Sequence, residues 1–200
     1  MQITAFLRCC AFALAGVGAA ASQAATVWDE SANGDLSNDG LSPTEIAVAP
    51  GSNQVFGTAG DSGGGIDRDY FRFTVPAGSS LTSIFLLPNT APSGDVSFIG
   101  MQGGPQLTVT PTGGGPGNLL AQGHYGSADI GTDILPVIAI GFTGALPSGT
   151  YSVWVQDTGG LATYGLDFAL SGVSAVPEPE SYALVLAGLG LIGSIAARRR

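Results

Sequence analysis

The sequence predicts an all-β fold: a single β-sandwich of jelly-roll type, with about eight short strands, in residues 25–175. Three observations lead to this expectation. Apolar and polar residues alternate with the period of two that a half-buried strand requires. Turn residues, mostly Pro, Gly and Ser, separate the alternating segments at short intervals. No part of this region keeps a helical period over three turns, and its length suffices for one domain with its own core.

The alternation is clearest at 70–75, where Phe71, Phe73 and Val75 share one face. The predicted strands are residues 70–75, 81–87, 96–101, 107–110, 136–142, 151–156 and 164–170. Pro-Ala-Gly or Pro-Ser-Gly turns, at 76–78, 92–94 and 147–149, each precede a predicted strand.

Residues 1–24 have the parts of a secretory signal peptide. Arg8 gives an early positive charge, an apolar stretch follows at 9–21, and Ser22 and Ala24 occupy the −3 and −1 positions of a cleavage site. We expect export through the Sec translocon and removal of this segment by signal peptidase. Both cysteines of the chain lie inside it, so the remaining protein cannot form disulfides.

The last part of the chain combines a polar motif, an apolar helix and a basic end. The motif comprises Val176, Pro177, Glu178, Pro179 and Glu180, and the basic end comprises Arg198, Arg199 and Arg200. The two prolines forbid a helix and hold the motif extended. The apolar residues 182–197 predict a transmembrane helix of roughly 24 Å, which a thinned bilayer accommodates. The three arginines place the C-terminus on the cytoplasmic side.

This order resembles the PEP-CTERM tail of proteins handled by exosortase, a membrane protease-transpeptidase of Gram-negative bacteria that make extracellular polysaccharide. The resemblance implies cleavage near residues 177–179 and loss of the membrane helix. It also implies a protein held briefly in the inner membrane and then found on the outer surface or in the extracellular matrix, as in a biofilm. The alternative is a plain membrane anchor, and the motif directly upstream of the helix favours sorting.

The region between the two ends is strongly acidic. Residues 25–175 contain thirteen Asp and Glu against two arginines, Arg68 and Arg72, a net charge of −11, and the chain has no lysine. This charge excludes nucleic acid and anionic lipid surfaces as electrostatic partners. It permits cations.

Closely spaced aspartates indicate a calcium site. Asp67 and Asp69 point to one side of an extended chain with Asp61 nearby in sequence, and a divalent cation would relieve their repulsion. Asp35 and Asp39 begin a second oxygen-rich loop, which resembles the opening of an EF-hand but lacks its twelfth-position Glu and its flanking helices. The alternative interpretation is a set of solvated turn aspartates.

Residues 67–78, Asp-Arg-Asp-Tyr-Phe-Arg-Phe-Thr-Val-Pro-Ala-Gly, resemble a segment of bacterial pre-peptidase C-terminal domains. Residues 146–151, Leu-Pro-Ser-Gly-Thr-Tyr, are similar to a recurring strand entry of the same domains. The resemblance covers these two short stretches. It implies a small non-catalytic β-sandwich of a type that in some cases binds calcium or polysaccharide. Arg68 and the long Gly-rich loops depart from the usual pattern.

One short motif suggests catalysis, and the rest of the chain argues against it. Gly-Asp-Ser-Gly-Gly at 60–64 matches the sequence around the nucleophile of trypsin-like proteases. A nucleophilic Ser62 needs a base, and the only histidine, His124, follows it, whereas trypsin-like enzymes place histidine first. The order would suit an α/β-hydrolase, but that fold needs a strand-to-helix elbow. We therefore expect no enzyme activity.

Aromatic residues provide a further class of site. Trp154 and Trp28 offer flat faces for stacking on sugar rings, although a core position is equally compatible with Trp154. Two functions of different class follow. The first is a non-catalytic surface or matrix protein, sorted and processed by exosortase in an exopolysaccharide-producing bacterium. The second is a calcium- or polysaccharide-binding module.

Overall fold

The computed structural model describes residues 24–94, 96–109 and 117–172, together with 185–186, 188–189 and 197–198. No helix formed by these residues is long and apolar enough to cross a membrane. Residues 1–23, the motif at 176–180, most of the apolar stretch at 182–197, Arg199 and Arg200 lie outside the described residues.

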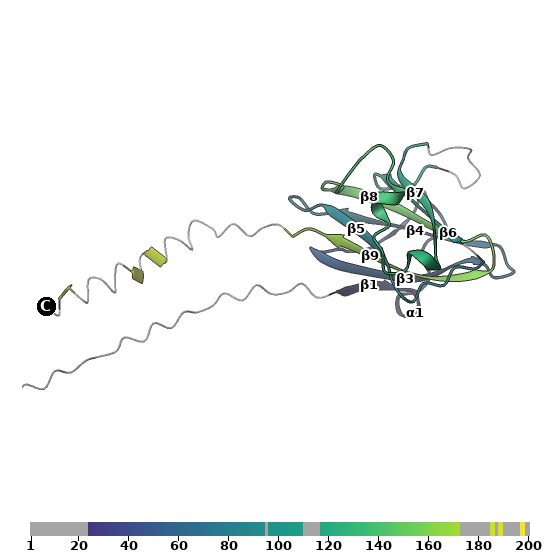
Figure 1. The fold of residues 1–200 in the computed structure, drawn as a ribbon, viewed down its shortest axis with the longest axis horizontal. Helices are drawn as coiled ribbons and strands as arrows, with labels where there is room; N and C mark the ends of the chain where they lie inside the picture. The colour runs from purple at the N-terminus through teal and green to yellow at the C-terminus, as the bar shows by residue number, and fades with distance from the viewer. Residues whose placement is uncertain are drawn as a thin grey trace, which may run out of the picture.

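The described part of the chain is mostly β, as predicted (Figure 1). Its nine strands are β1 (Ala25–Asp29), β2 (Thr44–Glu45), β3 (Gly51–Asp61), β4 (Ile66–Val75), β5 (Leu81–Leu86), β6 (Val96–Gly103), β7 (Leu119–Gly126), β8 (Gly149–Gln156) and β9 (Leu161–Leu170). The helical elements are short: α1 (Glu30–Asn33), the 3-10 turn η1 (Ser127–Asp129) and α2 (Leu135–Ile138).

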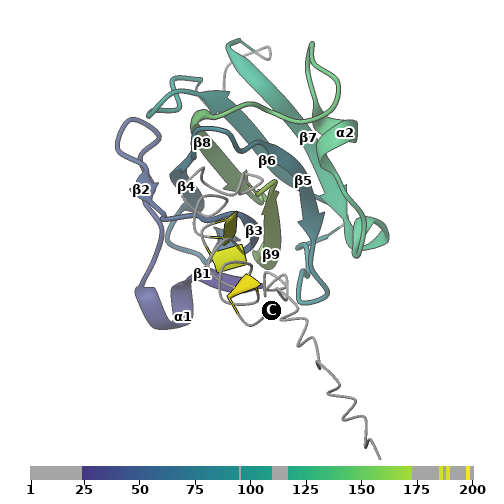
Figure 2. The ribbon, with the colours of Figure 1, turned by 90° about the vertical axis from the view of Figure 1, so that its left-hand side faces the viewer.

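The strands form one curled sheet in the order β5-β9-β3-β4-β8-β6-β7, and all neighbours along this path are antiparallel. β1 adds to β3 and β2 adds to β4, both in parallel. β3 and β4 pair only where Gly60 meets Asp67 and Asp61 meets Ile66, so the sheet folds over beyond this short contact. Figure 2 shows α1 and α2 on opposite sides of the molecule, with α2 beside β7.

The core lies between the two halves of the curled sheet. Phe71 and Phe73 of β4 face Phe168 of β9, with ring centroids 5.7 and 5.1 Å apart. Val75 is buried on the same face of β4, which confirms the predicted alternation. Full burial of an aromatic or branched side chain contributes about 1.5–3 kcal/mol, so this stripe stabilises the closed arrangement.

Both ends of the strand order, β5 and β7, are covered by the chain between η1 and β8. Isolated bridges join Leu81 to Leu146, Phe85 to Asp133 and Ala121 to Ala139. An uncovered edge strand offers unpaired N–H and C=O groups to other chains. This covering therefore protects the sheet from edge-to-edge association.

The predicted strand at 136–142 is wrong, because its first residues belong to α2. The Asp133 carboxylate accepts a hydrogen bond from the N–H of Leu135 at 3.1 Å and fixes the start of the turn. Pro136 lies in the first turn, where its restricted backbone suits a helix. The helix buries Leu135 and Ile138. A short apolar run does not by itself distinguish a buried strand from a buried helical turn.

A second, smaller apolar cluster lies on the outer side of β4 and β8. Its buried members are Tyr70, Leu107, Leu119 and Trp154. Leu107 reaches it from the loop after β6, and its N–H donates to the carbonyl of Gly40 at 2.8 Å. Residues 107–109 form no strand, so the strand predicted at 107–110 is wrong over its described residues. Its apolar pattern reflects the anchoring of a loop.

The two ends of the curled sheet are distinct. Ala25, at the start of β1, pairs with Asn53, and Leu170, at the end of β9, pairs with Gly51. The folded region therefore begins and finishes at one end, which we call the entry end (Figure 1). β3 runs from there to the opposite end, the far end, where Asp61 leads into the loop to β4. At ~3.3 Å per residue the strand spans roughly 30 Å.

Candidate metal centre

Three carboxylates from separate parts of the chain meet toward the far end of the sheet. Glu30 begins α1, Asp35 follows that helix, and Asp69 lies on β4. One oxygen atom of each lies within 4.8 Å of the other two. Calcium binds carboxylate oxygens at about 2.3–2.6 Å, so oxygens with this spacing suit the ligands of one ion. We call these three residues the carboxylate group.

Asp69 is the buried member of the carboxylate group. It continues the inward-facing alternation of Phe71 and Phe73, so its side chain lies between the two halves of the sheet. It is 0% exposed, and neither of its oxygens forms a hydrogen bond of standard geometry with the described residues, although the Tyr164 hydroxyl lies near enough to oppose the rise in its pKa. Burial, reinforced by the charge of Glu30, raises its pKa to about 9. An ionised carboxylate in this position needs a cation beside it.

Glu30 is oriented by backbone groups. Its Oε1 accepts a hydrogen bond from the N–H of Leu36 at 3.1 Å, and its Oε2 accepts one from the N–H of Thr58 at 2.7 Å. Burial raises the pKa of Glu30, and these two N–H groups oppose the rise. Asp29 caps α1 by accepting a bond from the N–H of Ser31 at 2.9 Å. The cap starts the helix at the residue that faces β3.

Asp35 gives the carboxylate group an open side. It follows Gly34, whose φ of 90° is a conformation that glycine adopts without strain. Asp35 is exposed, and together with Asp67 it lines a polar hollow of about 530 Å³. One oxygen of Asp67 is buried without a partner, and burial raises the pKa of this residue, an effect that Asn38 opposes. A fourth carboxylate therefore borders the group on its solvent side.

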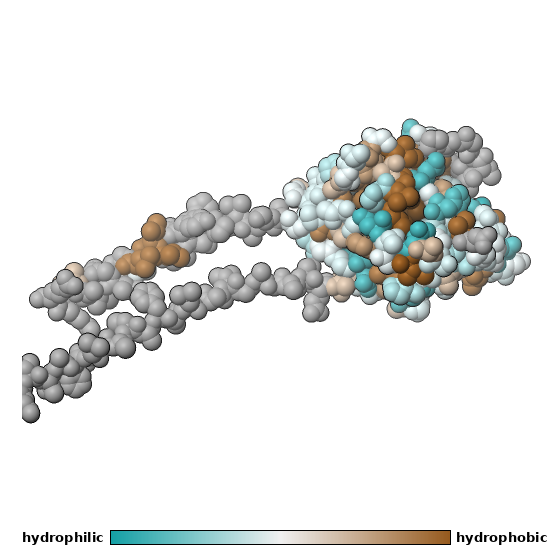
Figure 3. Space-filling model, viewed as in Figure 1, coloured by the Kyte–Doolittle hydropathy of each residue, from teal (hydrophilic) through white to brown (hydrophobic). Residues whose placement is uncertain are grey.

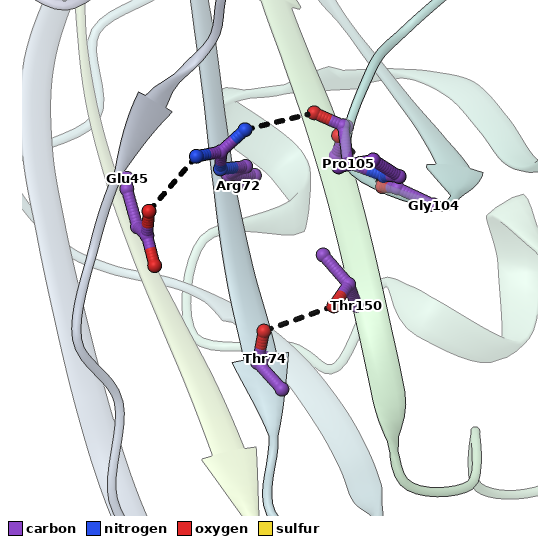
Figure 4. A network of polar contacts seen from close by, with 7 residues as sticks. Glu45, Arg72, Thr74, Gly104, Pro105 and Thr150 are labelled. Carbon is purple, nitrogen blue, oxygen red and sulfur yellow. Dashed lines mark hydrogen bonds and ion pairs between the residues drawn. The ribbon is translucent and has the colours of Figure 1, made fainter.

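Neither arginine of the acidic region neutralises the carboxylate group. Arg68 donates from Nε to the side-chain oxygen of Gln156 at 2.7 Å. Arg72 pairs with Glu45 at 2.8 Å and reaches the carbonyl of Pro105 (Figure 4). That pair is the single salt bridge in the described part of the chain. Arg68 lines the polar hollow beside Asp35 and Asp67 but forms no ion pair with the described acids. Because the chain has no lysine, a proton or a cation from solution has to neutralise the buried part of the group.

Of the five metal ligands predicted from the sequence, Asp35 and Asp69 belong to the carboxylate group, and Asp67 lies beside it. Asp61 and Asp39 are not members. Each is exposed and accepts a hydrogen bond from the N–H two residues ahead. Those bonds are typical of aspartates that shape turns.

Glu30 is the ligand that sequence reasoning missed. A signal was present, since four of the thirteen acidic residues fall between positions 29 and 39. Which of them faces β4 depends on the helical turn after β1 and on the pairing of β1 with β3. Neither element follows from the local pattern of residues.

Two tyrosine hydroxyls extend the polar interior next to the carboxylate group. Tyr164 and Tyr125 are buried, and neither hydroxyl has a hydrogen-bond partner among the described residues. Burial and the charge of Asp69 raise the pKa of Tyr164. Gly57 of β3 lies so close to the Tyr164 hydroxyl that any Cβ there would collide with it. A side chain at position 57 would therefore displace the phenol.

The two predicted stacking residues differ. Trp154 is 5% exposed and packs against Phe98, with ring centroids 4.7 Å apart, and against Tyr70. Its ring has no open face for a sugar, so Trp154 is a core residue. Trp28 is half-buried against the main core, and its indole N–H lacks a partner among the described residues. Its role in glycan stacking stays a prediction.

The residues of the protease-like motif show no catalytic arrangement. Ser62 lies in the exposed loop after β3 and lines the polar hollow. His124 lies on β7, exposed, with its ring edge-on to Phe98 at 5.6 Å. No hydrogen bond of the described residues joins the two side chains. The expectation of no enzyme activity stays a prediction.

The C-terminal segment has a known counterpart. Residues 175–200 match the PEP-CTERM protein-sorting motif. The match begins one residue before the predicted boundary at Val176. No curated protein and no solved structure matches the chain. The PEP-CTERM motif indicates an exported protein that passes through the membrane and is processed by exosortase. The likeness to pre-peptidase domains rests on residues 67–78 and 146–151 alone and stays a prediction.

Proposed function

We propose that the chain is a non-catalytic protein of the cell surface or extracellular matrix of an exopolysaccharide-producing bacterium, with one calcium ion in its folded region. The PEP-CTERM motif at residues 175–200 is the observation that supports export and sorting to the cell surface. In this proposal signal peptidase removes residues 1–24, and residues 25–175 fold outside the cytoplasm as a β-sandwich of jelly-roll type. Exosortase then removes the helix at 182–197.

The calcium site is the second part of the proposal, and the buried carboxylate of Asp69 supports it. Its two oxygens lack partners among the described residues, and Glu30 and Asp35 bring further oxygens within 4.8 Å. Calcium tolerates irregular oxygen cages, whereas Mg²⁺ demands near-octahedral geometry at shorter distances. Extracellular calcium modules have dissociation constants on the order of 0.1–1 mM. We expect a dissociation constant in that range or below it.

A calcium- and polysaccharide-binding module is the alternative function. It is favoured by the polar hollow, which Asp35 and Asp67 line on the solvent side of the carboxylate group. An ion held by Asp69 and Glu30 would keep coordination positions open toward this hollow. Sugar hydroxyls are suitable ligands for such positions. Saturable binding of the producer's polysaccharide in calcium, lost in EDTA, would favour this function over a passive matrix protein.

Processing by exosortase is tested by mass spectrometry of the protein released at the cell surface. Processing by exosortase predicts a C-terminus upstream of Tyr182. The same strain without exosortase is the control, and there the full C-terminal segment is expected to remain. A released protein that still carries Arg198, Arg199 and Arg200 would contradict the proposal.

The calcium site is tested by calorimetric titration of the processed protein with calcium. We expect one calcium site. The variant Asp69→Asn should lower its calcium affinity by a factor of about 100 or more, because about 2.7 kcal/mol of charge attraction is lost. Asp61→Asn is the matched control, because Asp61 is an exposed aspartate outside the carboxylate group. Equal calcium affinity of Asp69→Asn and wild type would refute the site.

A further inference from the structure

The described segments that form the entry end of the curled sheet carry no charged residue. The segments that form this end are residues 46–53, 74–82, 143–150 and 168–172, and none contains Asp, Glu, Lys, Arg or His. The strand register places them together, because Val75 pairs with Gly149 and Leu81 pairs with Leu170. The nearest charged groups are Asp167, whose oxygens accept bonds from Ser52 and Asn53, and the mutually paired Arg72 and Glu45.

The far end carries the acidic residues instead. Asp61 and Asp67 flank the loop between β3 and β4, Asp157 begins the loop between β8 and β9, and Asp129 ends η1 after β7. In Figure 3 the entry end, at the left of the folded region, has the pale colours of near-neutral hydropathy, and the strongly hydrophilic surface lies away from it. The net charge of −11 is thus unevenly distributed along an axis of roughly 30 Å.

The connection to the membrane segment leaves from the uncharged end. β9 ends at Leu170, and the described part of this region ends at Gly172. Nine residues, 173–181, separate it from the apolar stretch that begins at Tyr182. A chain of this length reaches at most about 35 Å. While the C-terminal helix is in the bilayer, the entry end is therefore confined to the neighbourhood of the lipid surface.

The uneven charge determines which part of the surface can approach lipid. An anionic bilayer repels acidic side chains within a Debye length, about 8 Å at physiological ionic strength. The far-end aspartates lie well beyond that distance when the entry end is in contact. We propose that the entry end is the surface with which the precursor rests on the phospholipid headgroups, so that the acidic far end points outward. The proposal rests on the sorting motif and its predicted membrane helix, and it is independent of calcium binding.

Site-specific fluorescence quenching tests this orientation. The full chain, with Cys9→Ser and Cys10→Ser, is inserted into vesicles of phosphatidylethanolamine and phosphatidylglycerol that carry a quencher on the headgroup. Single cysteines for the fluorophore replace the exposed residues Ala77 or Ser148 at the entry end and Ser62 or Thr158 at the far end. We expect quenching at the entry end to be several-fold stronger. Equal quenching at both ends, or stronger quenching at the far end, would overturn the proposal.

Charge variants separate a contact surface from simple tethering. With the fluorophore at exposed Ala145, the pair Ala77→Glu and Ser148→Glu should reduce the quenching at least about two-fold, because it places acids against an anionic surface. The pair Ser62→Glu and Thr158→Glu is the matched control at the far end and should leave the quenching unchanged. If the entry-end pair has no effect either, the chain connection alone sets the orientation, and the proposed contact surface is refuted.

Discussion

Glu45 and Asp69 are two acids at β4 with opposite environments. Glu45 is 70% exposed on the neighbouring β2 and forms a salt bridge with Arg72. Asp69 is 0% exposed, has no ion-pair partner among the described residues, and lies against Glu30 and Asp35. The one salt bridge of the described residues thus lies where water already screens both charges. The buried acids therefore depend on protons or on a cation from solution.

The largest expected effect is a dependence of stability on pH in the absence of calcium. The pKa of Asp69 is about 9 in the folded protein, and that of an unfolded aspartate is about 3.9. The folded state then holds a proton that the unfolded state releases. The free energy of unfolding therefore falls as pH rises from about 4 to about 9, by several kcal/mol in total. Urea unfolding in EDTA across this window measures the slope.

The variant Asp69→Asn sharpens this prediction. An amide does not titrate, so most of the slope should disappear, and the metal-free variant should be more stable than wild type at neutral pH. Asp61→Asn provides the control and should retain the slope of the wild type. Identical pH profiles for Asp69→Asn and wild type would show that Asp69 is not buried as described.

The variant Glu30→Gln should lower the stability of the metal-free protein, whereas Asp69→Asn should raise it, and the change should be smaller. The Glu30 carboxylate accepts hydrogen bonds from the N–H groups of Leu36 and Thr58, one on each oxygen. A glutamine side chain has only one oxygen to accept them. Its NH₂ would then face a backbone donor, which costs about 1–3 kcal/mol even without calcium. Thermal unfolding in EDTA measures this loss. Stabilisation by Glu30→Gln would mean that its charge, rather than its hydrogen bonds, dominates its environment.

The smallest effect is expected for Arg72→Gln. The Arg72 side chain is 33% exposed and that of Glu45 70%, and exposed pairs of this kind contribute about 0.2–1 kcal/mol. High salt should reduce the difference between the variant and wild type, because it screens the wild-type pair. Calcium affinity should stay the same, since Arg72 is not a member of the carboxylate group. A large loss of calcium affinity in this variant would break the contrast between the two environments.

The sequence predicted the strands whose burial alternates clearly. β4 and β9 carry large inward-facing side chains such as Phe71, Phe73 and Phe168, and both were expected. β3 was not, because its inner face includes Gly57 and Ala59, which give no apolar signal. Gly57 is nevertheless required, since the Tyr164 hydroxyl occupies the space of a side chain. The local composition of β3 therefore does not predict a strand, and its pairing with β9 defines it.

The candidate site was predictable in part for a similar reason. Asp67 and Asp69 lie in phase with Phe71 and Phe73 on β4, so their common direction followed from the sequence. Glu30 is 39 residues from Asp69 along the chain, and only the pairing of β1 with β3 brings the two together. The sequence shows which acids are available to the carboxylate group. Which of them come together depends on how the sheet folds, and the local sequence does not show that.

Asp69 is a buried carboxylate that a proton or a cation has to neutralise. Carbon-13 NMR of the aspartate side chains, recorded against pH with EDTA and then with calcium, measures this directly. Without calcium, the Asp69 carboxyl should titrate near pH 9; with calcium, it should be ionised at neutral pH. Titration near pH 4 in both conditions would show that Asp69 is not a buried carboxylate in need of neutralisation.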